Sequence, residues 1–529
     1  MVKIRGPAYS MTAQGWLGRS FYAKHGIVPI PYPVGLLPKH LTHSVYYSIK
    51  GWCYQRRRTW HGVIWSAMRP PISVQPNTAI QYAYKQVFAE GVHTWQGMNQ
   101  ATKDVYNKWR YPVKASGYNR FLRWYLKENL AFEMEDKYIA TKIVAADGSG
   151  DYTDIQSALD ALPAGGGLVF VKEGTYTLTS TITIAKSNVT LAGQGDATII
   201  KIGDGADINA ITLGDGVDPY SNIVIRDLKI DGNEDNQASN GIGIKILGQV
   251  SRVVIDGCHV VETRDFSVDS DQDSSYLTII NCLFDSDAGG VNVNYCHNFV
   301  FAFNVIATAS HIGVWLYNSN NFLLLGNYIK NPGTVGFSSA NIFCSGCSRG
   351  QIIGNVVLEH YYNDIWLNGC SRVVISDNEI GGDNEIGINI YESTDCRVIG
   401  NYGTTLNQGI SVMSSPRCII IGNEFEASQW GAINIWGSTD CIVKGNFLKD
   451  NSVATDNTYD GVRLDGTCLR CVISGNVIYE VAANKAKYGI NENNAACNYN
   501  LIQGNIIRGW QTASVRVQGA NSLVDTNII

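Results

Sequence analysis

The stretch DCRVIGNYGTTLNQGISVMSSPRCIIIGNEFEASQWGAINIWGSTDCIVKGNF, residues 395–447, repeats one short pattern three times. Each time, apolar residues lead to a basic or apolar residue, then to Gly and Asn, at Asn401, Asn423 and Asn446. The steps of 22 and 23 residues between these asparagines fall in the range of solenoid repeats. The stretch therefore predicts stacked repeats rather than one compact core.

The same pattern continues on both sides of this stretch. Its Asn column occupies Cys258, Cys282, Asn304, Asn327, Asn355, Asn378, Asn401, Asn423, Asn446, Asn476, Asn505 and Asn527. The steps run from 22 to 30 residues, which fits β-helix coils that carry occasional inserted loops. We predict a mainly β protein whose residues 141–529 form a right-handed, single-stranded parallel β-helix of about 12 or more coils.

The segment DGSGDYTDIQSALDALPAGGGLVFVKEGTYTLTSTITI, residues 147–184, precedes the first coils. An amphipathic helix begins after Thr153-Asp154 and stops at Pro163, and it would cover the open edge of the first coil. Together with the Gly-Asn coils, this segment resembles the pectin-lyase-like β-helix superfamily. That superfamily includes pectate lyases, polygalacturonases, alginate epimerases and phage tailspikes, so the resemblance implies the fold and leaves several functions open.

The cysteines follow the same register as the asparagines. Five residues before the Asn column lie Cys396, Cys418, Cys441 and Cys471, and eight residues before it lie Cys296, Cys347, Cys370, Cys468 and Cys497. A metal site or disulfide staples would be one interpretation. Stacks of small buried thiols are the interpretation we favour, because zinc-type spacing with a His partner is missing and the total of 13 cysteines is odd.

Residues 1–140 form a separate region of the chain, which is basic and rich in Trp. Residues 1–137 carry 19 Lys and Arg against 6 Asp and Glu, so the rest of the chain has a net charge of −18. We expect an extended basic arm over residues 1–76, including Arg56-Arg57-Arg58, and a small helical module over residues 77–140. The stretch FAEGVHTWQGMNQATKDVYNKW resembles helical modules of viral virion proteins, which implies an anchor to other virion proteins.

Two further expectations concern the partners and the location of the chain. The helical stretch also resembles an HMG box, but the Arg run lies outside it, which disfavours nucleic acid as a partner. The start MVKIRGPAYS has no signal-peptide core, and no run of about 18 apolar residues predicts a membrane span. The expected location is a virion, an extracellular particle assembled in the host cytoplasm.

The outward side chains of one strand per coil form the candidate ligand surface. In the strand at residues 387–393, Ile388 and Ile390 point inward, so Asn389 and Tyr391 point outward. Aligning the coils adds Val293 and Tyr295 in one coil and Val412 and Ser414 in another, with Gln408 in a neighbouring turn column. The predicted ligand-binding residues are Tyr295, His311, Trp315, Tyr317, Tyr362, Trp366, Asn389, Tyr391, Trp430 and Trp436.

Rows of exposed aromatic rings on a strand face are typical of a binding surface. Flat rings match the apolar faces of sugars, and the Asn, Asp and Arg side chains between them match sugar hydroxyls. The alternative is that these rings pack beneath inserted loops or against a neighbouring subunit.

Catalysis on a glycan would need paired carboxylates, and Asp364 with Glu385 on neighbouring coils is the candidate pair. Asp269, Asp271 and Asp273 are weak candidates for a Ca²⁺ site, or simply a solvated acidic turn; no other cofactor is expected. The superfamily motifs Gly-His-Gly, Asn-Thr-Asp and Asp-Pro-His-Glu are missing, which favours a binding protein over an enzyme.

These observations favour a virion-associated, receptor-binding spike whose β-helix binds host surface polysaccharide. A polysaccharide depolymerase on the same scaffold, either a glycoside hydrolase or a lyase, is the first alternative. A purely structural or decorative virion β-helix protein is the second. The resemblance to tailspikes implies a homo-oligomer, a trimer by analogy.

Overall fold

The chain divides into two compact units, residues 1–136 and 137–529. The computed structural model describes residues 46–49, 52–59, 62–68, 95–96, 98, 103 and 141–529, except 272, 287–288, 309–311, 331–339, 360–361, 383–385 and 482–484. In the first unit, β1 (Tyr46–Ile49), β2 (Trp52–Thr59) and β3 (Gly62–Met68) form an antiparallel sheet within the predicted extended arm. The predicted helical module lies almost entirely outside the described residues.

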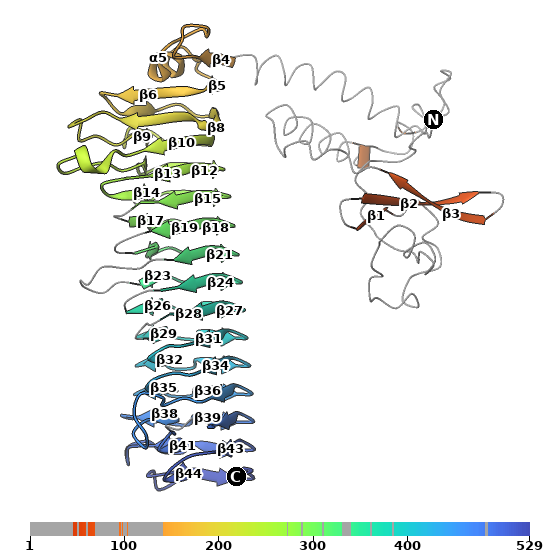
Figure 1. The fold of residues 1–529 in the computed structure, drawn as a ribbon, viewed down its shortest axis with the longest axis vertical. Coiled ribbons are helices and arrows are strands. Elements are labelled where there is room, and N and C mark those ends of the chain that lie inside the picture. The colour runs from red at the N-terminus through yellow and green to blue at the C-terminus, as the bar shows by residue number, and fades with distance from the viewer. Residues whose placement is uncertain are drawn as a thin grey trace. The chain divides into compact units, whose positions relative to one another are not determined.

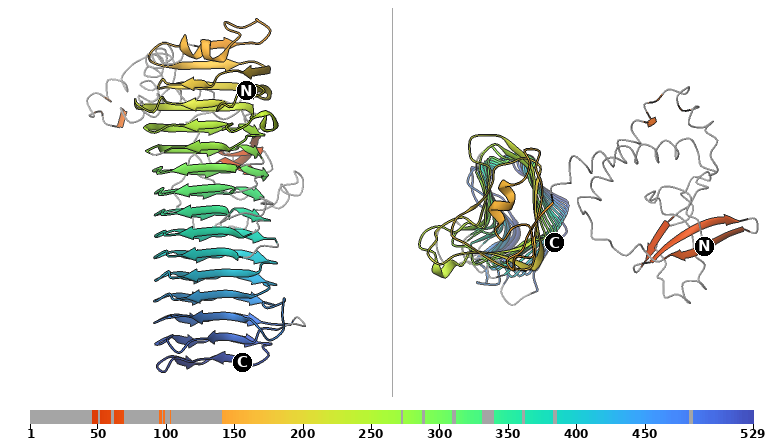
Figure 2. Two further views of the ribbon diagram at one scale, coloured as in Figure 1. Left: turned by 90° about the vertical axis from the view of Figure 1, so that its left-hand side faces the viewer. Right: turned by 90° about the horizontal axis from the view of Figure 1, so that it is seen from above.

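The second unit is a stack of coils, each built from up to three short strands (Figure 1). Strands of successive coils pair in parallel, which gives three ladders along the axis; Figure 2 shows the strands lying one above another. Ladder A is a 14-stranded parallel sheet. Its strands are β7 (Ile182–Ile184), β9 (Ile211–Leu213), β11 (Ile244–Ile246), β14 (Phe266–Ser270), β17 (Gly289–Asn294), β20 (Val314–Tyr317), β23 (Ala340–Ser345), β26 (Asn363–Asn368), β29 (Ile386–Tyr391), β32 (Gln408–Met413), β35 (Gly431–Trp436), β38 (Asp460–Asp465), β41 (Tyr488–Glu492) and β44 (Ala513–Arg516).

Ladders B and C follow each other within every coil, on either side of the Asn column. Ladder B contains β4 (Thr141–Val144), β5 (Gly167–Val171), β8 (Val189–Ile202), β10 (Tyr220–Asp231), β12 (Val250–Asp256), β15 (Ser275–Ile280), β18 (Val300–Ala302), β21 (Leu323–Leu325), β24 (Gln351–Ile353), β27 (Val374–Ser376), β30 (Arg397–Ile399), β33 (Ile419–Ile421), β36 (Ile442–Lys444), β39 (Val472–Ser474), β42 (Leu501–Gln503) and β45 (Leu523–Asp525). Ladder C contains β6 (Gly174–Leu178), the second halves of β8 and β10, β13 (His259–Val261), β16 (Leu283–Asp285), β19 (Val305–Thr308), β22 (Tyr328–Lys330), β25 (Val356–Leu358), β28 (Glu379–Gly381), β31 (Tyr402–Thr404), β34 (Glu424–Glu426), β37 (Phe447–Lys449), β40 (Val477–Tyr479) and β43 (Ile506–Arg508).

The Asn column lies at the corner between ladders B and C, as the sequence predicts. The Oδ1 atom of Asn378 accepts hydrogen bonds from both the backbone N–H and the Nδ2 of Asn355, each at 2.9 Å. Asn378 in turn donates from Nδ2 to the Ile352 carbonyl and to Asn401 Oδ1. The residue before the Asn has a positive φ, +64° at Gly354 and +55° at Asp377, and glycine is the residue that adopts this conformation without strain. Each buried amide is therefore fully paired, and the corner is specified coil by coil.

The cysteines of the β-helix are all free and buried. They line the core beside the corners; for example, the Cys441 thiol lies 3.4 Å from the Ser415 carbonyl of the preceding coil. Among the residues that the structure describes, no group of three or more His, Cys, Asp or Glu side chains is placed to hold a metal ion. The favoured interpretation, stacks of small buried thiols, therefore agrees with the structure.

The predicted helix over the first coil is present as α5 (Ile155–Asp160), and a 3-10 turn, η2, spans Glu234–Asn236. The carboxylate of Asp154 caps α5 by accepting from the Ser157 N–H at 2.7 Å. Ile155, Ala158 and Leu159 are buried, and α5 contacts β4, β5 and β7. Figure 1 shows α5 at the top of the stack. In the described part of the chain, no helix has the length and hydropathy needed to cross a membrane.

In two coils, the residues predicted to point outward were wrong by one position along the strand. Asn292 pairs with Trp315, and Val293 pairs with the inward Leu316 and has no exposed surface. Likewise Ser411 pairs with Asn389, while Val412 continues the inward stack below Ile390. A slip of one residue exchanges the two faces of a strand, and the valines occupy the core because burial of their apolar surface is favourable.

Candidate functional site

One outward column runs the whole length of ladder A. In register order it contains Thr183, Thr212, Lys245, Asp269, Asn292, Trp315, Phe343, Trp366, Asn389, Ser411, Asn434, Arg463, Asn491 and Arg516. Ionic side chains stand near its first coils, aromatic rings in the middle, and amides with Arg near its end. The predicted alignment of Trp315, Trp366 and Asn389 is confirmed by this strand pairing.

The middle of the column is a row of neighbouring, mutually tilted aromatic rings, which Phe266 of β14 extends from outside the column. Ring centroids lie 6.4 Å apart between Phe266 and Trp315, 6.0 Å between Trp315 and Phe343, and 4.7 Å between Phe343 and Trp366. Both Trp side chains are half-buried, and their indole nitrogens are buried without a hydrogen-bond partner. Phe343 was not among the predicted residues, although it stands 12 residues before Asn355, as Trp366 does before Asn378.

Three of the predicted aromatic residues are clearly exposed. Tyr317 is 38% exposed, Trp430 39% and Trp436 46%. Tyr317 and Trp436 belong to a second outward column of ladder A, which lies two residues further along each strand than the first. Tyr317 meets Tyr295 edge to face at 5.3 Å. Trp436 lies against the turn at Gly466, where a Cβ would come within 3.1 Å of its indole nitrogen.

The other predicted ligand-binding residues are less accessible. Tyr295, Tyr362, Asn389 and Tyr391 are half-buried, and Asn389 Nδ2 donates to Asn363 Oδ1 at 3.1 Å. A hydrogen bond with Glu392 raises the pKa of Tyr391. His311 and Glu385 lie outside the described residues.

The structure does not place Asp364 on the ligand face. Its side chain has no exposed surface, and Oδ1 accepts from Asn341 Nδ2 at 3.1 Å inside the coil. The chain passes two inward residues in succession here, Asp364 and Ile365, because the strand begins at a corner of the coil. The prediction of Asp364 as an outward catalytic carboxylate is therefore wrong.

The acidic cluster near the first coils is held by a lysine. The Lys245 ammonium bonds to Asp269 at 2.5 Å and to Asp271 at 2.6 Å. Burial opposes the charge of Lys245, but the hydrogen bonds to the two carboxylates outweigh it and raise the pKa of the lysine. Asp271 and Asp273 also line a cleft of about 570 Å³ with Tyr295 and Tyr317. The ammonium occupies the place that a cation would take between Asp269 and Asp271.

A second cleft, of about 280 Å³, lies between the two exposed tryptophans. Its lining residues are Gln408, Trp430, Gly431, Ile433, Asn434, Trp436, Tyr459, Asp460 and Arg463, from β32, β35, β38 and the turns before them. The sequence prediction found both tryptophans but missed Asp460. A carboxylate directly before the Gly-Val start of a ladder A strand was the available signal.

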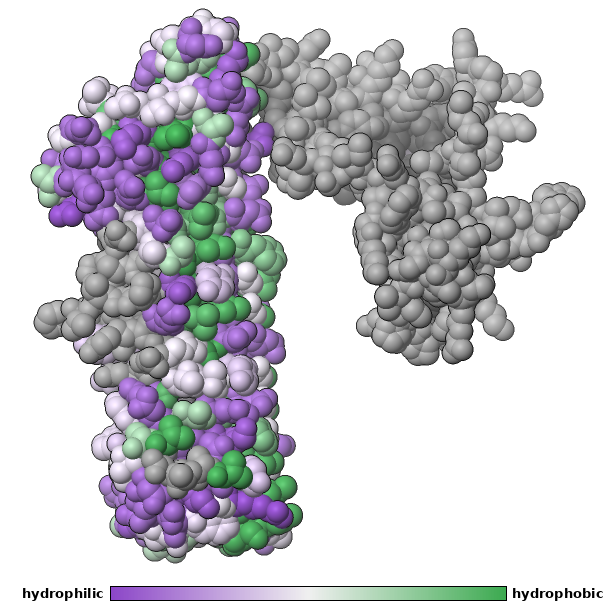
Figure 3. All heavy atoms as spheres, in the orientation of Figure 1, coloured by the Kyte–Doolittle hydropathy of each residue, from purple (hydrophilic) through white to green (hydrophobic). Residues whose placement is uncertain are grey.

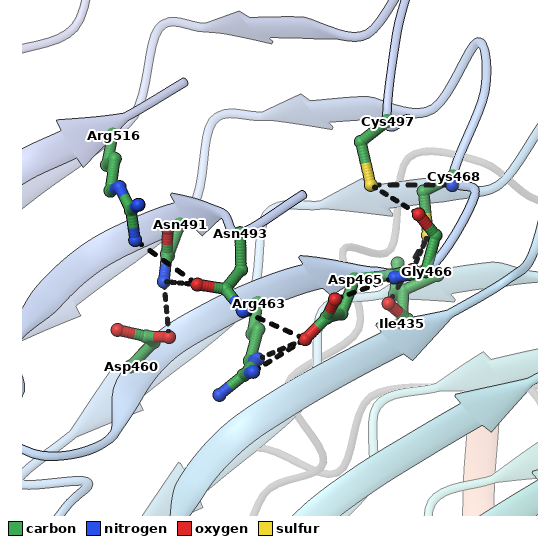
Figure 4. Close-up of polar contacts among 10 residues, drawn as sticks. All are labelled: Ile435, Asp460, Arg463, Asp465, Gly466, Cys468, Asn491, Asn493, Cys497 and Arg516. Carbon is green, nitrogen blue, oxygen red and sulfur yellow. Dashed lines mark hydrogen bonds and ion pairs between the residues drawn. The ribbon is translucent and has the colours of Figure 1, made fainter. Parts of the chain in front are cut away.

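Asp460 is the chemically distinctive group of this cleft. The residue is only 5% exposed, and Asn491 Nδ2 donates to its Oδ2 at 2.8 Å (Figure 4). Burial raises the pKa of the Asp460 carboxyl. Its Oδ1 is buried without a partner, as are the Oδ1 atoms of Asn434 and Asn491. Three acceptor oxygens at and beside the cleft thus lack donors.

An ionic network supports one end of the cleft (Figure 4). Arg463 donates to Asp465 Oδ2 from Nη2 at 2.5 Å and from Nε at 3.1 Å. Asn493 donates to the same carboxylate at 3.0 Å and accepts from Arg516 at 3.2 Å. Burial opposes ionisation of Asp465, but these hydrogen bonds prevail and lower its pKa. Arg463 is therefore held in one orientation beside Asp460.

The family of the chain follows from this fold. The model for the right-handed beta helix region matches residues 169–337 and 271–448, more than half of the chain, and the chain belongs to this family. The predicted right-handed parallel β-helix is confirmed.

Each curated relative matches the chain over only part of its own length. The mannuronan C5-epimerase AlgE2 of Azotobacter vinelandii is 28% identical over 406 residues, which is 71% of this chain and 36% of that protein. AlgE4 of the same organism is 32% identical over 174 residues, 30% of this chain and 32% of that protein. The chain thus spans about a third of the length of these relatives.

Two solved structures are similar to the chain at low sequence identity. The tailspike of E. coli bacteriophage HK620, in complex with a hexasaccharide, has a TM-score of 0.49 and 14% identity over 72% of this chain and 80% of that chain. The AlgE6 A-module of Azotobacter vinelandii has a TM-score of 0.41 and 20% identity over 73% of this chain and 99% of that chain.

Proposed function

We propose that the outward face of ladder A binds a polysaccharide, with the cleft between Trp430 and Trp436 as its principal site. The observation that carries this proposal is the combination of two exposed indoles with polar side chains, among them Gln408 and Arg463, that line the same cleft. A pyranose ring offers both complements, since its C–H faces stack on aromatic rings and its hydroxyls donate hydrogen bonds. An apolar ligand would cover these polar side chains without giving them hydrogen-bond partners, at a cost in free energy.

Two further features support a polymeric ligand. The outward column continues from the cleft along the axis to the Trp315–Trp366 stack, so a chain can follow successive coils. Relatives such as AlgE2 are named as mannuronan C5-epimerases, and mannuronan is a polysaccharide. We place this surface on a virion spike whose first unit attaches to other virion proteins, with host surface polysaccharide as the ligand; immunogold labelling of purified particles tests that location.

The binding proposal is tested by affinity electrophoresis through gels containing purified host surface polysaccharides. Trp430→Ala and Trp436→Ala should each lower the affinity by about 1–3 kcal/mol, since each removes a stacking surface. Tyr479→Ala is the matched control, because Tyr479 is 39% exposed on ladder C, away from the cleft. Equal retention of all three variants and the wild type would contradict the proposal.

A second candidate function is a proton-transfer reaction on the bound polysaccharide. Asp460 is the one carboxylate among the described residues that line the cleft, and Asp465 lies five residues further along the strand, about 16 Å away. Hydrolysis by two carboxylates needs a separation of about 5–10 Å. A reaction that removes a proton beside a uronate carboxylate needs one base and one cation, and Asp460 and Arg463 fill these places.

In that reaction the Asp460 carboxylate takes the proton from the carbon that bears the uronate carboxylate. The carbanion electrons then either expel the neighbouring glycosidic oxygen, which takes up a proton, or accept a proton on the opposite face from a second acid such as Tyr459. Asp460→Asn should abolish the change seen by NMR of the polysaccharide while retention in the gel persists. Asp440→Asn, in an exposed ion pair with Arg470, is the control. An unmodified polysaccharide with wild-type protein would leave binding as the function.

A further inference from the structure

The cleft at Tyr295 and Tyr317 has the size and the aromatic lining of a sugar site. Its volume is about 570 Å³, and Tyr317 is 38% exposed beside it. The two rings meet edge to face at 5.3 Å, so each limits the movement of the other. A cleft of this size with aromatic rings in its wall suits a sugar-sized ligand. We call it the tyrosine cleft, and the cleft between Trp430 and Trp436 the tryptophan cleft.

Strand pairing sets the two clefts in line along the stack. The second outward column of ladder A contains, in register order, Asn294, Tyr317, Ser345, Asn368, Tyr391, Met413 and Trp436. The five steps from Tyr317 to Trp436 span about 24 Å at the spacing of paired strands. One extended polysaccharide along this column therefore reaches both clefts, whereas a disaccharide reaches only one.

The tyrosine cleft carries a negative charge. Asp271 and Asp273 line it. The Lys245 ammonium pairs with Asp271 and also with Asp269, so one cation serves two carboxylates. Asp273 is exposed and forms no ion pair with any residue that the structure describes. Figure 3 shows hydrophilic residues gathered over the first coils, on the side where Figure 1 labels β9 and β14.

The tryptophan cleft differs, because Arg463 is part of its lining. Between the two clefts, neither outward column of ladder A contains a charged residue. A negatively charged sugar would be repelled at the tyrosine cleft, since like charges a few ångströms apart destabilise each other. An uncharged sugar avoids this repulsion, and an amine-bearing sugar would supply the cation that Asp273 lacks.

We propose that the tyrosine cleft is a second sugar site, for a sugar without negative charge, on the polysaccharide that also occupies the tryptophan cleft. This inference rests on the proposed function, because it takes one polysaccharide across both clefts. The ligand is then a heteropolysaccharide whose repeat includes a neutral or amine-bearing sugar. A homopolymer of uronate, such as mannuronan, would place a carboxylate against Asp271 and Asp273.

Affinity electrophoresis with a host surface polysaccharide that the wild type retains tests the second site. Tyr317→Ala should weaken retention about tenfold, since it removes a stacking surface. Tyr402→Ala is the matched control, because Tyr402 is 39% exposed on ladder C, away from both clefts. Circular dichroism verifies that each variant is folded.

The outcomes separate this inference from the proposed function. Weaker retention of Trp436→Ala with unchanged retention of Tyr317→Ala would overturn the second site and leave the proposed function standing. Unchanged retention of both variants would overturn the two proposals together.

Chain length gives a readout that a merely structural role of Tyr317 would not change. In the wild type, fragments of the polysaccharide longer than about 24 Å should compete with the polymer in the gel better than shorter fragments do. In Tyr317→Ala this advantage should largely disappear, because only the tryptophan cleft then holds a sugar. An advantage of long fragments that persists in Tyr317→Ala would contradict a second site.

Neutralisation of one aspartate tests the charge that the site accepts. In a gel containing polymannuronate, Asp273→Asn should increase retention about threefold, which is the effect of one unit charge about 6 Å away in water. Asp377→Asn is the matched control, because both aspartates are exposed and have a positive φ, +65° at Asp273 and +55° at Asp377, and Asp377 lies at the corner between ladders B and C. Equal retention of the wild type and both variants would overturn the exclusion of negatively charged sugars.

The retained host polysaccharide then identifies which uncharged or cationic sugar is bound. A loss of retention in Asp273→Asn indicates an amine-bearing sugar, and unchanged retention indicates a neutral one. Stronger retention of Asp273→Asn in this gel would overturn the inference, because it would mean that the sugar at the tyrosine cleft is negatively charged.

Discussion

Glu480 sets a pH limit on the stability of the β-helix. It follows β40 at a corner of the coil and is only 3% exposed. Its Oε1 accepts from the Asn451 N–H at 3.1 Å, and its Oε2 is buried without a partner. Burial raises the pKa of Glu480 from 4.5 to about 8. The carboxyl is therefore protonated in the folded chain at neutral pH and ionised in the unfolded chain.

The sign of the effect follows from these two pKa values. Between about pH 4.5 and pH 8 the folded state binds one more proton than the unfolded state, so the free energy of unfolding falls as pH rises. Each pH unit costs about 1.4 kcal/mol, and a gap of about 3.5 units gives a loss of about 5 kcal/mol. The contribution is fully present below about pH 4.5 and is lost by the time pH has risen through about 8.

Glu480→Gln removes this titration while it keeps an acceptor for the Asn451 N–H. Chemical denaturation at pH 5, 7 and 9 measures the free energy of unfolding of both proteins. The variant should be comparable to or less stable than the wild type at pH 5, and more stable by about 5 kcal/mol at pH 9. Glu262→Gln changes an exposed glutamate and should show a constant difference from the wild type. Parallel pH profiles of wild type and Glu480→Gln would refute the reasoning.

Asn401→Ala removes the acceptor of two hydrogen bonds from Asn378 and should lower the free energy of unfolding by about 3 kcal/mol or more, because buried donors remain unpaired. Denaturation of Asn521→Ala, at an exposed asparagine, is the comparison and should show a far smaller loss. The twelve buried thiols of the β-helix should react with a thiol reagent only after denaturation, and rapid labelling of Cys441 in the native chain would contradict the core that is described. Lys245→Met should destabilise the first coils by about 3 kcal/mol, since Asp269 and Asp271 would lose their shared partner, and partial proteolysis near β11 would report it.

The parts of the fold that repeat were predictable from the sequence, and the parts at the corners were not. Asn at a fixed place in every coil and Cys at fixed distances from it revealed the stack, because each position has the same surroundings in each coil. The outward face follows from alternation of apolar and polar residues, which holds in the middle of a strand such as β29. At strand starts two successive residues point inward, so alternation fails there.

Asp364 and Asp460 illustrate that limit. Strand pairing aligns Asn363, through β29, β32 and β35, with Asp460, so Asp364 is aligned with Gly461. Asp364 and Asp460 thus occupy neighbouring positions in the strand alignment. This difference of one position encloses Asp364 in the coil, whereas Asp460 lines the cleft. The sequence also could not predict how accessible each aromatic ring is. Trp315 and Trp366 are half-buried among neighbouring rings, whereas Trp430 and Trp436 are exposed and line the cleft.

The most direct test of the central claim is a crystal structure of the chain soaked with an oligosaccharide that it retains in the gel assay. We expect a sugar ring stacked on Trp436 or Trp430, with hydroxyl groups hydrogen-bonded to polar side chains of the cleft such as Gln408 and Arg463, and the remaining sugars following ladder A. A sugar bound on ladder B or ladder C, with the cleft at Trp430 and Trp436 holding only water, would contradict the account.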